Sequence, residues 1–122
     1  MAESYLPPDW PADVRPPGTD DFERTSVNWL LDHCPPDFRA YETLRRHPGL
    51  LVRLAVEQLR AALEACRAGY RTARADLKDV DARVLDELLA VYEHEGRRLA
   101  AAVRSAELLA AALRGERFTR PL

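Results

Sequence analysis

The fold is decided by two stretches, residues 48–76 (PGLLVRLAVEQLRAALEACRAGYRTARAD) and residues 82–114 (ARVLDELLAVYEHEGRRLAAAVRSAELLAAALR). In the first stretch, the residues seven apart are Val52, Leu59, Cys66 and Ala73. In the second, the same spacing gives Leu85, Tyr92, Leu99, Ala106 and Leu113. Residues seven apart lie on one side of a helix, so each stretch predicts a long helix with a continuous apolar face.

The connection between the two stretches is short, so we expect the helices to pack antiparallel as a hairpin. The sequence holds nine prolines, and none lies between Gly49 and Arg120. Asp79 or Asp81 is expected to cap the second helix, and Gly115 to end it. The predicted helices run from Pro48 to about Asp76 and from about Ala82 to Arg114.

Folding the hairpin about residue 79 predicts which residues face each other. The expected pairs are Cys66 with Tyr92, Leu59 with Leu99, Tyr70 with Leu88, and Ala62 with Gly96. A glycine inside a helix costs about 1 kcal/mol relative to alanine. We interpret Gly96 as part of a close crossing in which it meets Ala62.

The N-terminal third differs from this region because it is rich in proline. Residues 1–19 are predicted to be an extended arm, and residues 20–122 a single helical domain. Asp20 with Glu23 resembles a capping box that opens a short helix from about Asp21 to His33. Pro36 and Asp37 favour the start of a second short helix, which Pro48 ends. The predicted fold is all-α and four-helix bundle-like, with two long and two short helices.

No catalytic, cofactor or metal site is predicted, and we expect no enzyme activity. The three histidines are scattered, and His94 is followed at position 98 by arginine, where a zinc-binding helix would need a second histidine. Glu95 falls on the apolar seam, where we expect it to pair with an arginine or with Tyr70. Cys34 and Cys66 are interpreted as small buried apolar residues, with a disulfide or a reactive thiol as the alternative.

Some apolar residues lie off the main seam and form a candidate partner surface. They are Leu50, Leu54, Val84, Val91 and Leu108. Trp10, in the proline-rich arm, is a candidate anchor for a partner's groove; the alternative is that it packs on its own chain. We therefore expect a non-catalytic interaction or regulatory protein that forms a homodimer or binds an unidentified protein partner.

Charge suggests a second candidate surface. Lysine and arginine number 18 and acidic residues 20, which argues against a general binder of polyanions. Antiparallel packing nevertheless brings several arginines to one end of the hairpin: Arg45, Arg46, Arg53, Arg104, Arg114 and Arg117. This basic end could hold phosphates, so a DNA- or RNA-associated accessory factor is the alternative function. A third reading is that the charged faces are solvated and pair with one another.

Three segments carry a resemblance: Trp29 to Arg39 (WLLDHCPPDFR), Leu44 to Pro48 (LRRHP) and Gly115 to Leu122 (GERFTRPL). By these the chain resembles small proteins rich in alanine and arginine from high-GC actinobacteria. The resemblance implies a bacterial, cytoplasmic helical protein and carries no site residue. Absence of an apolar run near the roughly 20 residues that span a bilayer agrees with that location.

Overall fold

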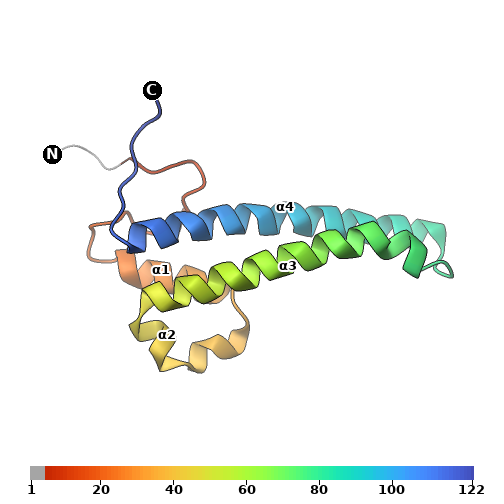
Figure 1. Cartoon of the computed structure of the whole chain (residues 1–122), viewed down its shortest axis with the longest axis horizontal. Coiled ribbons are helices and arrows are strands. Elements are labelled where there is room, and N and C mark those ends of the chain that lie inside the picture. Colours follow the sequence, from red (N-terminus) through yellow and green to blue (C-terminus); the bar gives the residue numbers. More distant parts are fainter. Residues whose placement is uncertain (1–4) are drawn as a thin grey trace.

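The computed structural model describes residues 5–122, which form helices and turns and contain no strand (Figure 1). The elements are α1 (Phe22–Asp32), the 3-10 helix η1 (Pro36–Ala40), α2 (Glu42–Arg46), α3 (Pro48–Asp76) and α4 (Ala82–Leu113). The all-α prediction is confirmed, and so are the two long helices. Their observed ends lie within one residue of the expected positions.

The ends of α4 follow from the residues that flank it. The Asp81 side chain accepts a hydrogen bond from the Arg83 backbone N–H at 2.9 Å, which caps the first turn. Gly115 has a φ of 93°, a conformation that glycine adopts without steric cost. The N–H of Gly115 donates to Ala112 and the N–H of Glu116 donates to Ala111, so the helix ends in a Schellman motif.

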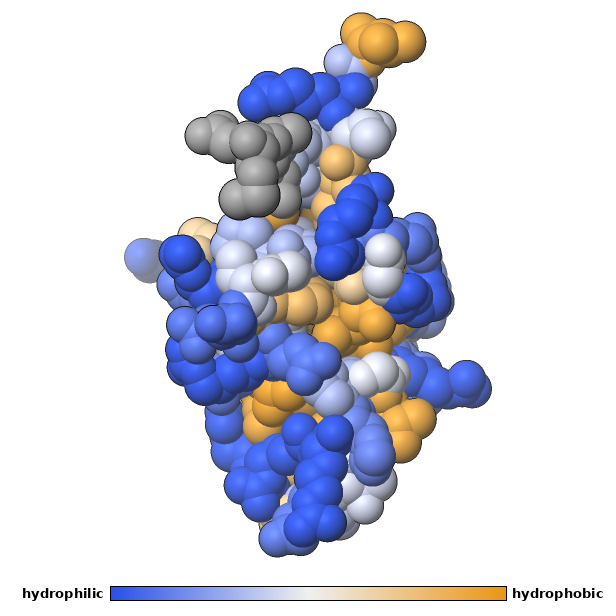
Figure 2. Space-filling model, turned by 90° about the vertical axis from the view of Figure 1, so that its left-hand side faces the viewer, coloured by the Kyte–Doolittle hydropathy of each residue, from blue (hydrophilic) through white to orange (hydrophobic). Residues whose placement is uncertain are grey.

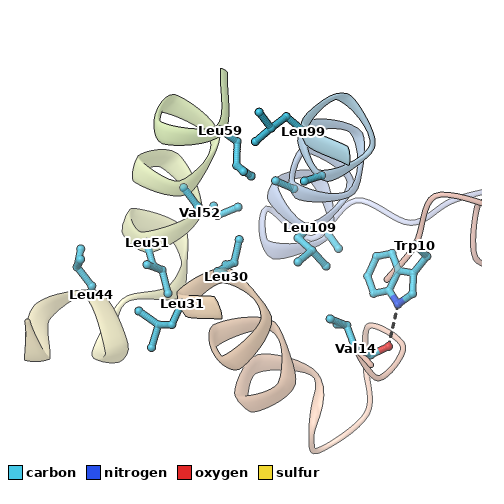
Figure 3. Packing of buried hydrophobic residues seen from close by; sticks show 14 of the residues in the cluster. Trp10, Val14, Leu30, Leu31, Leu44, Leu51, Val52, Leu59, Leu99 and Leu109 are labelled. Carbon is cyan, nitrogen blue, oxygen red and sulfur yellow. Dashed lines mark hydrogen bonds between the residues drawn. The ribbon is translucent and has the colours of Figure 1, made fainter. Parts of the chain in front are cut away.

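The short helices lie against one half of the hairpin only (Figure 1). We call residues 48–61 and 99–113 the inner half, and residues 62–76 and 82–98 the outer half. In the inner half, α1 packs against both α3 and α4. Leu30 of α1, Leu51 of α3 and Leu109 of α4 are each 0% exposed (Figure 3). The main core is therefore three helices deep.

The outer half is held by a smaller cluster. Its buried members are Ala73, Leu85 and Leu89, and Leu77, Leu88 and Tyr92 pack partly buried against them. All of these residues come from α3, α4 and the turn between them, so this part of the molecule is only two helices deep.

The predicted extended arm is wrong for residues 5–19, and residues 1–4 of that arm lie outside the described part. The segment forms successive turns, in which the N–H groups of Trp10, Val14 and Thr19 donate to the carbonyls of Pro7, Pro11 and Pro16. Gly18, at the third position of the last turn, has a φ of 88°, as a type II turn requires. Prolines here set turns rather than an extended chain.

Trp10 packs on its own chain, which was the alternative expectation. Its ring lies 6.0 Å from that of Phe22 and 5.8 Å from that of Phe118, measured between centroids. The indole N–H donates to the Val14 carbonyl at 2.9 Å (Figure 3). With 9% of its surface exposed, Trp10 does not offer an anchor to a partner in this structure.

Two other local predictions need correction. Helix α1 begins after Asp21, without a hydrogen bond from a capping side chain, so the expected capping box at Asp20 is wrong. The second short helix is divided at Tyr41, whose backbone is extended, into η1 and α2.

The surroundings of Gly69 and Gly96 differ from the expected close crossing, in which Gly96 meets Ala62. A Cβ added at Gly69 would lie 2.6 Å from Tyr92 Oη and 2.7 Å from its Cε1, so the tyrosine ring occupies the space of a side chain there. A Cβ at Gly96 would have Cys66 Sγ as its nearest neighbour, at 3.9 Å. Ala62 is exposed, so its predicted pairing with Gly96 is wrong. The close approach in this hairpin is between Gly69 and Tyr92.

We predict opposite effects for alanine at these two glycines. Gly96→Ala should stabilise the fold by about 1 kcal/mol, because alanine favours the helix and meets only ordinary contacts. Gly69→Ala should destabilise it, since forced overpacking costs about 1–3 kcal/mol. Urea unfolding followed by circular dichroism measures both, and a loss of stability in Gly96→Ala would contradict the assignment.

We predict that Trp10→Ala lowers the free energy of unfolding by about 3 kcal/mol, the low end for removing a buried tryptophan. Tyr41→Ala, at a side chain that is 53% exposed, is the matched control and should change little. Chemical unfolding of both variants tests whether the N-terminal segment belongs to the core. Equal stability of the two would mean that this segment is not docked in solution.

Candidate functional site

The apolar residues predicted as a partner surface fall in different places. Leu54 and Leu108 are half-buried and pack against the main core. Leu50, 51% exposed, lies in a groove of about 750 Å³ that Arg53 and Arg114 also line. Val84 and Val91, 52% and 56% exposed, lie on α4 in the outer half. Leu50 and the two valines are therefore the exposed members of the predicted surface, and only the valines lie in the outer half.

These valines belong to a face of α4 that is buried in the main core further along the helix. Eighteen residues make about five helical turns, so residues 18 apart point in the same direction. Val84, Leu88 and Val91 thus share their direction with Ala102, Ala106 and Leu109, which are 6%, 0% and 0% exposed. The same apolar face is buried in the inner half and open in the outer half.

The neighbouring face of α3 carries small residues, with one charged residue, Asp76, at its end. By helical periodicity its small residues share one side of the helix in the outer half, and each is exposed or half-buried: Ala62, Ala65, Ala68, Gly69, Thr72 and Ala75. The charged residues Glu64, Arg67, Arg71 and Arg74 occupy the other side. We call the small residues of α3 together with Val84, Leu88 and Val91 the outer apolar face.

The predicted basic end does not form one cationic surface. Four of its arginines pair with carboxylates: Arg46 with Glu42, Arg53 with Glu57, Arg104 with Asp9, and Arg114 with Glu116. Arg117 donates to the Glu116 backbone carbonyl at 3.1 Å. Figure 2 shows this end of the molecule, where hydrophilic side chains surround hydrophobic ones. These ion pairs neutralise most of the positive charge that we expected at this end of the hairpin.

Glu95 pairs with an arginine, as predicted. Its carboxylate accepts hydrogen bonds from Arg98 Nε and Nη2 at 2.9 and 2.7 Å. The bond from Arg98 lowers the pKa of Glu95 below its ordinary value, and the same bond raises the pKa of Arg98. Tyr70 donates instead to Glu93, at 3.1 Å. Glu95 is therefore held as a charged, paired group.

The two cysteines are free thiols in the structure. Burial raises the pKa of Cys34, which disfavours the reactive thiolate. Cys66 donates to the Tyr92 carbonyl at 3.2 Å and so confirms the predicted pairing of these two positions. Within residues 5–122, no group of three or more histidine, cysteine, aspartate or glutamate residues is placed to hold a metal ion. Over the same range, every helix is too short or too polar to cross a membrane.

A cleft that the sequence did not predict lies between α3 and α4. It has a volume of about 440 Å³ and is lined by Cys66, Arg67 and Tyr70 with Tyr92, Gly96 and Arg97, among others. It sits where the main core ends and the outer cluster begins, since Cys66 packs against the first and Tyr92 against the second. Glycine at position 96 leaves this part of the seam without a side chain.

Polar bridges join α3 to α4 on the side where the cleft opens. Arg60 pairs with Glu107 at 2.8 Å, and Arg74 with Asp86 at 4.0 Å. Between them, neither Arg67 nor Arg97 forms an ion pair with a carboxylate of residues 5–122. Arg67 and Arg97 both line the cleft together with Gly96, so positive charge lies beside an apolar floor.

One signal in the sequence could have found this cleft. Cys66 and Tyr92 are a predicted facing pair, Arg67 follows Cys66, and Gly96 lies about one helical turn beyond Tyr92. We interpreted Gly96 as part of a close crossing with Ala62 and so did not connect it with Arg67. Compared with family models, curated proteins and solved structures, the chain matched none.

Proposed function

We propose that this chain is a non-catalytic interaction protein that assembles as a homodimer through the outer apolar face. The observation that carries the proposal is the pair of exposed valines, 52% and 56% exposed, on a face that is buried elsewhere along the same helix. Exposed apolar patches of this kind commonly mark protein interfaces.

The shape of the chain favours a second copy as the occupant. Each copy is three helices deep over the inner half, where α1 lies on the hairpin, and two helices deep over the outer half (Figure 1). This change in depth forms a step at the end of α1. Two copies fit together when they lie antiparallel, with the outer half of one copy packed on the outer half of the other. In this arrangement α4 packs on the partner's α4 and α3 on the partner's α3. The contact is isologous, as in most homodimers.

The residues of the face suit close helix packing. Alanine and glycine on α3 let two backbones approach, while Val84, Leu88 and Val91 supply apolar side chains on α4. The outer half is about 22 Å long at 1.5 Å per residue, and two helices span about 20 Å in width. The interface is thus roughly 450 Å² per copy, close to the lower limit for specific association. We expect a dissociation constant in the micromolar range.

The prediction is that Val84→Glu combined with Val91→Glu makes the protein monomeric. Light scattering coupled to size exclusion, over protein concentrations from about 1 to 200 µM, measures the change. Both side chains are exposed in the single chain, so the variant should keep its circular dichroism spectrum.

Leu50→Glu is the matched control, because Leu50 is equally exposed but lies in the inner half. It should leave the dimer unchanged. A wild-type protein that stays monomeric at about 200 µM, which is far above a micromolar dissociation constant, would refute the dimer. If only the Leu50 variant lost the dimer, the interface would lie in the inner half.

The alternative, a nucleic-acid accessory function at the basic end, has weaker support because Arg46, Arg53, Arg104 and Arg114 are each paired with a carboxylate. Arg45, beside Arg46 on α2, forms no ion pair with residues 5–122 and is the best remaining contact. On this alternative, duplex DNA is retained in a gel at low salt, and Arg45→Ala with Arg46→Ala abolishes the retention. Absence of retention by the wild type would remove it.

A further inference from the structure

We propose that the cleft beside Gly96 binds a small organic anion, with a flat apolar body and a phosphate or carboxylate end group. The ligand's anionic group would meet Arg67 and Arg97, and its flat body would lie against Tyr70 and the floor formed by Gly96 and Ala100. This inference does not depend on the proposed dimer.

Positively charged side chains dominate the lining of the cleft. Three arginines, Arg67, Arg71 and Arg97, line the cleft against one carboxylate, Glu93. Glu93 accepts the Tyr70 hydroxyl at 3.1 Å, and Arg71 has a long contact with Glu64 at 3.7 Å. Arg67 and Arg97 come from different helices, and neither has a carboxylate partner within residues 5–122. Guanidinium groups recognise phosphate and carboxylate through paired hydrogen bonds, so two of them around one space select an anion.

Gly96 keeps the floor of the cleft free of a side chain. An alanine at position 96 would find its nearest neighbour, Cys66 Sγ, at 3.9 Å, so packing does not require glycine there. Glycine inside a long helix is nevertheless the less stable choice. A functional reason accounts for it: a methyl group at position 96 would project into the cleft floor. Residues that keep a binding site open at the expense of stability are common in proteins.

The size and the lining of the cleft suit a small aromatic ligand. The cleft volume of about 440 Å³ lies within the range of small-molecule sites. Tyr70 is 42% exposed and lies at the rim, where it offers one face of its ring to a ligand. A single ring with one charged group therefore matches both the space and the lining.

The cleft and the outer apolar face are on different sides of the hairpin. On α3, Arg67 and Tyr70 point away from the side that carries Ala62 and Ala65, by the 100° rotation per residue. Ala62 lines a hollow with Cys34 of the α1 end, whereas Arg67 does not. A dimer through the outer apolar face leaves the cleft open, so the two proposals can fail separately.

The test is a titration of the full chain with phenyl phosphate, followed by backbone amide NMR. We expect saturable shifts at Gly96, Arg97 and Ala100 with one site per chain, and at least about tenfold weaker binding of inorganic phosphate, which lacks the ring. Benzoate distinguishes the two end groups: stronger binding of benzoate would identify a carboxylate site, and weaker binding a phosphate site. Absence of saturable shifts with both aromatic anions would overturn the proposal.

Variants tie the binding to the cleft. Arg67→Ala with Arg97→Ala should weaken phenyl phosphate binding at least about tenfold, whereas Arg45→Ala with Arg53→Ala, two exposed arginines elsewhere, should not. Gly96→Ala should weaken binding while raising the melting temperature. Gly49→Ala, where an added Cβ meets nothing within 4 Å, should leave binding unchanged.

The monomeric Val84→Glu, Val91→Glu protein should bind phenyl phosphate like the wild type, because those side chains do not line the cleft. Unchanged binding in the Arg67, Arg97 variant, with its circular dichroism spectrum intact, would mean that the anion sits elsewhere.

Discussion

Two antiparallel helices bury only the strip of side chains along their line of contact, and any further apolar residue needs a third layer. This constraint governs the molecule. In the inner half, Leu30 of α1 supplies the third layer against Leu51 and Leu109, and all three are fully buried. The outer half has no such layer among residues 5–122, and its cluster is small. Both candidate surfaces lie where the third layer stops.

The long helices could be predicted from the sequence because their signals are local. Heptad spacing sets the buried face, Asp81 and Gly115 set the ends of α4, and Pro48 begins α3. Each of these signals acts within a turn or two of helix, so neighbouring residues decide it. The level at which α3 meets α4 also follows, since a short turn fixes it.

The rest of the structure could not be predicted, because it depends on contacts between residues far apart in the sequence. Trp10 is buried by Phe22 and Phe118, and Arg104 is neutralised by Asp9. Neither the burial of Trp10 nor the pairing of Arg104 can be recognised from a short stretch of sequence. The facing-pair rule fixes the level of two residues but not their rotation about each helix, which is why Ala62 is exposed instead of meeting Gly96. The cleft escaped prediction because its arginines belong to different helices.

Gly69 and Gly96, the two glycines on the seam of the hairpin, have different structural roles. At Gly69 the missing side chain is replaced by the Tyr92 ring, which fills the space and joins the outer cluster to the seam. At Gly96 the corresponding space stays open and becomes a cleft. The two helical glycines of the seam therefore mark the places where the chain leaves room beside a helix, filled by Tyr92 at one and left as a cleft at the other.

The site around Trp10 joins the first described turns to the residues beyond α4. Phe118 follows the Gly115 turn, which directs the chain back over the indole ring. Because Phe22 and Phe118 both contact this indole, its pocket is complete only when segments from both sides of the long hairpin have come together. The N-terminal segment is therefore held by contacts of long sequence separation, which cost more chain entropy to form than contacts within a helix.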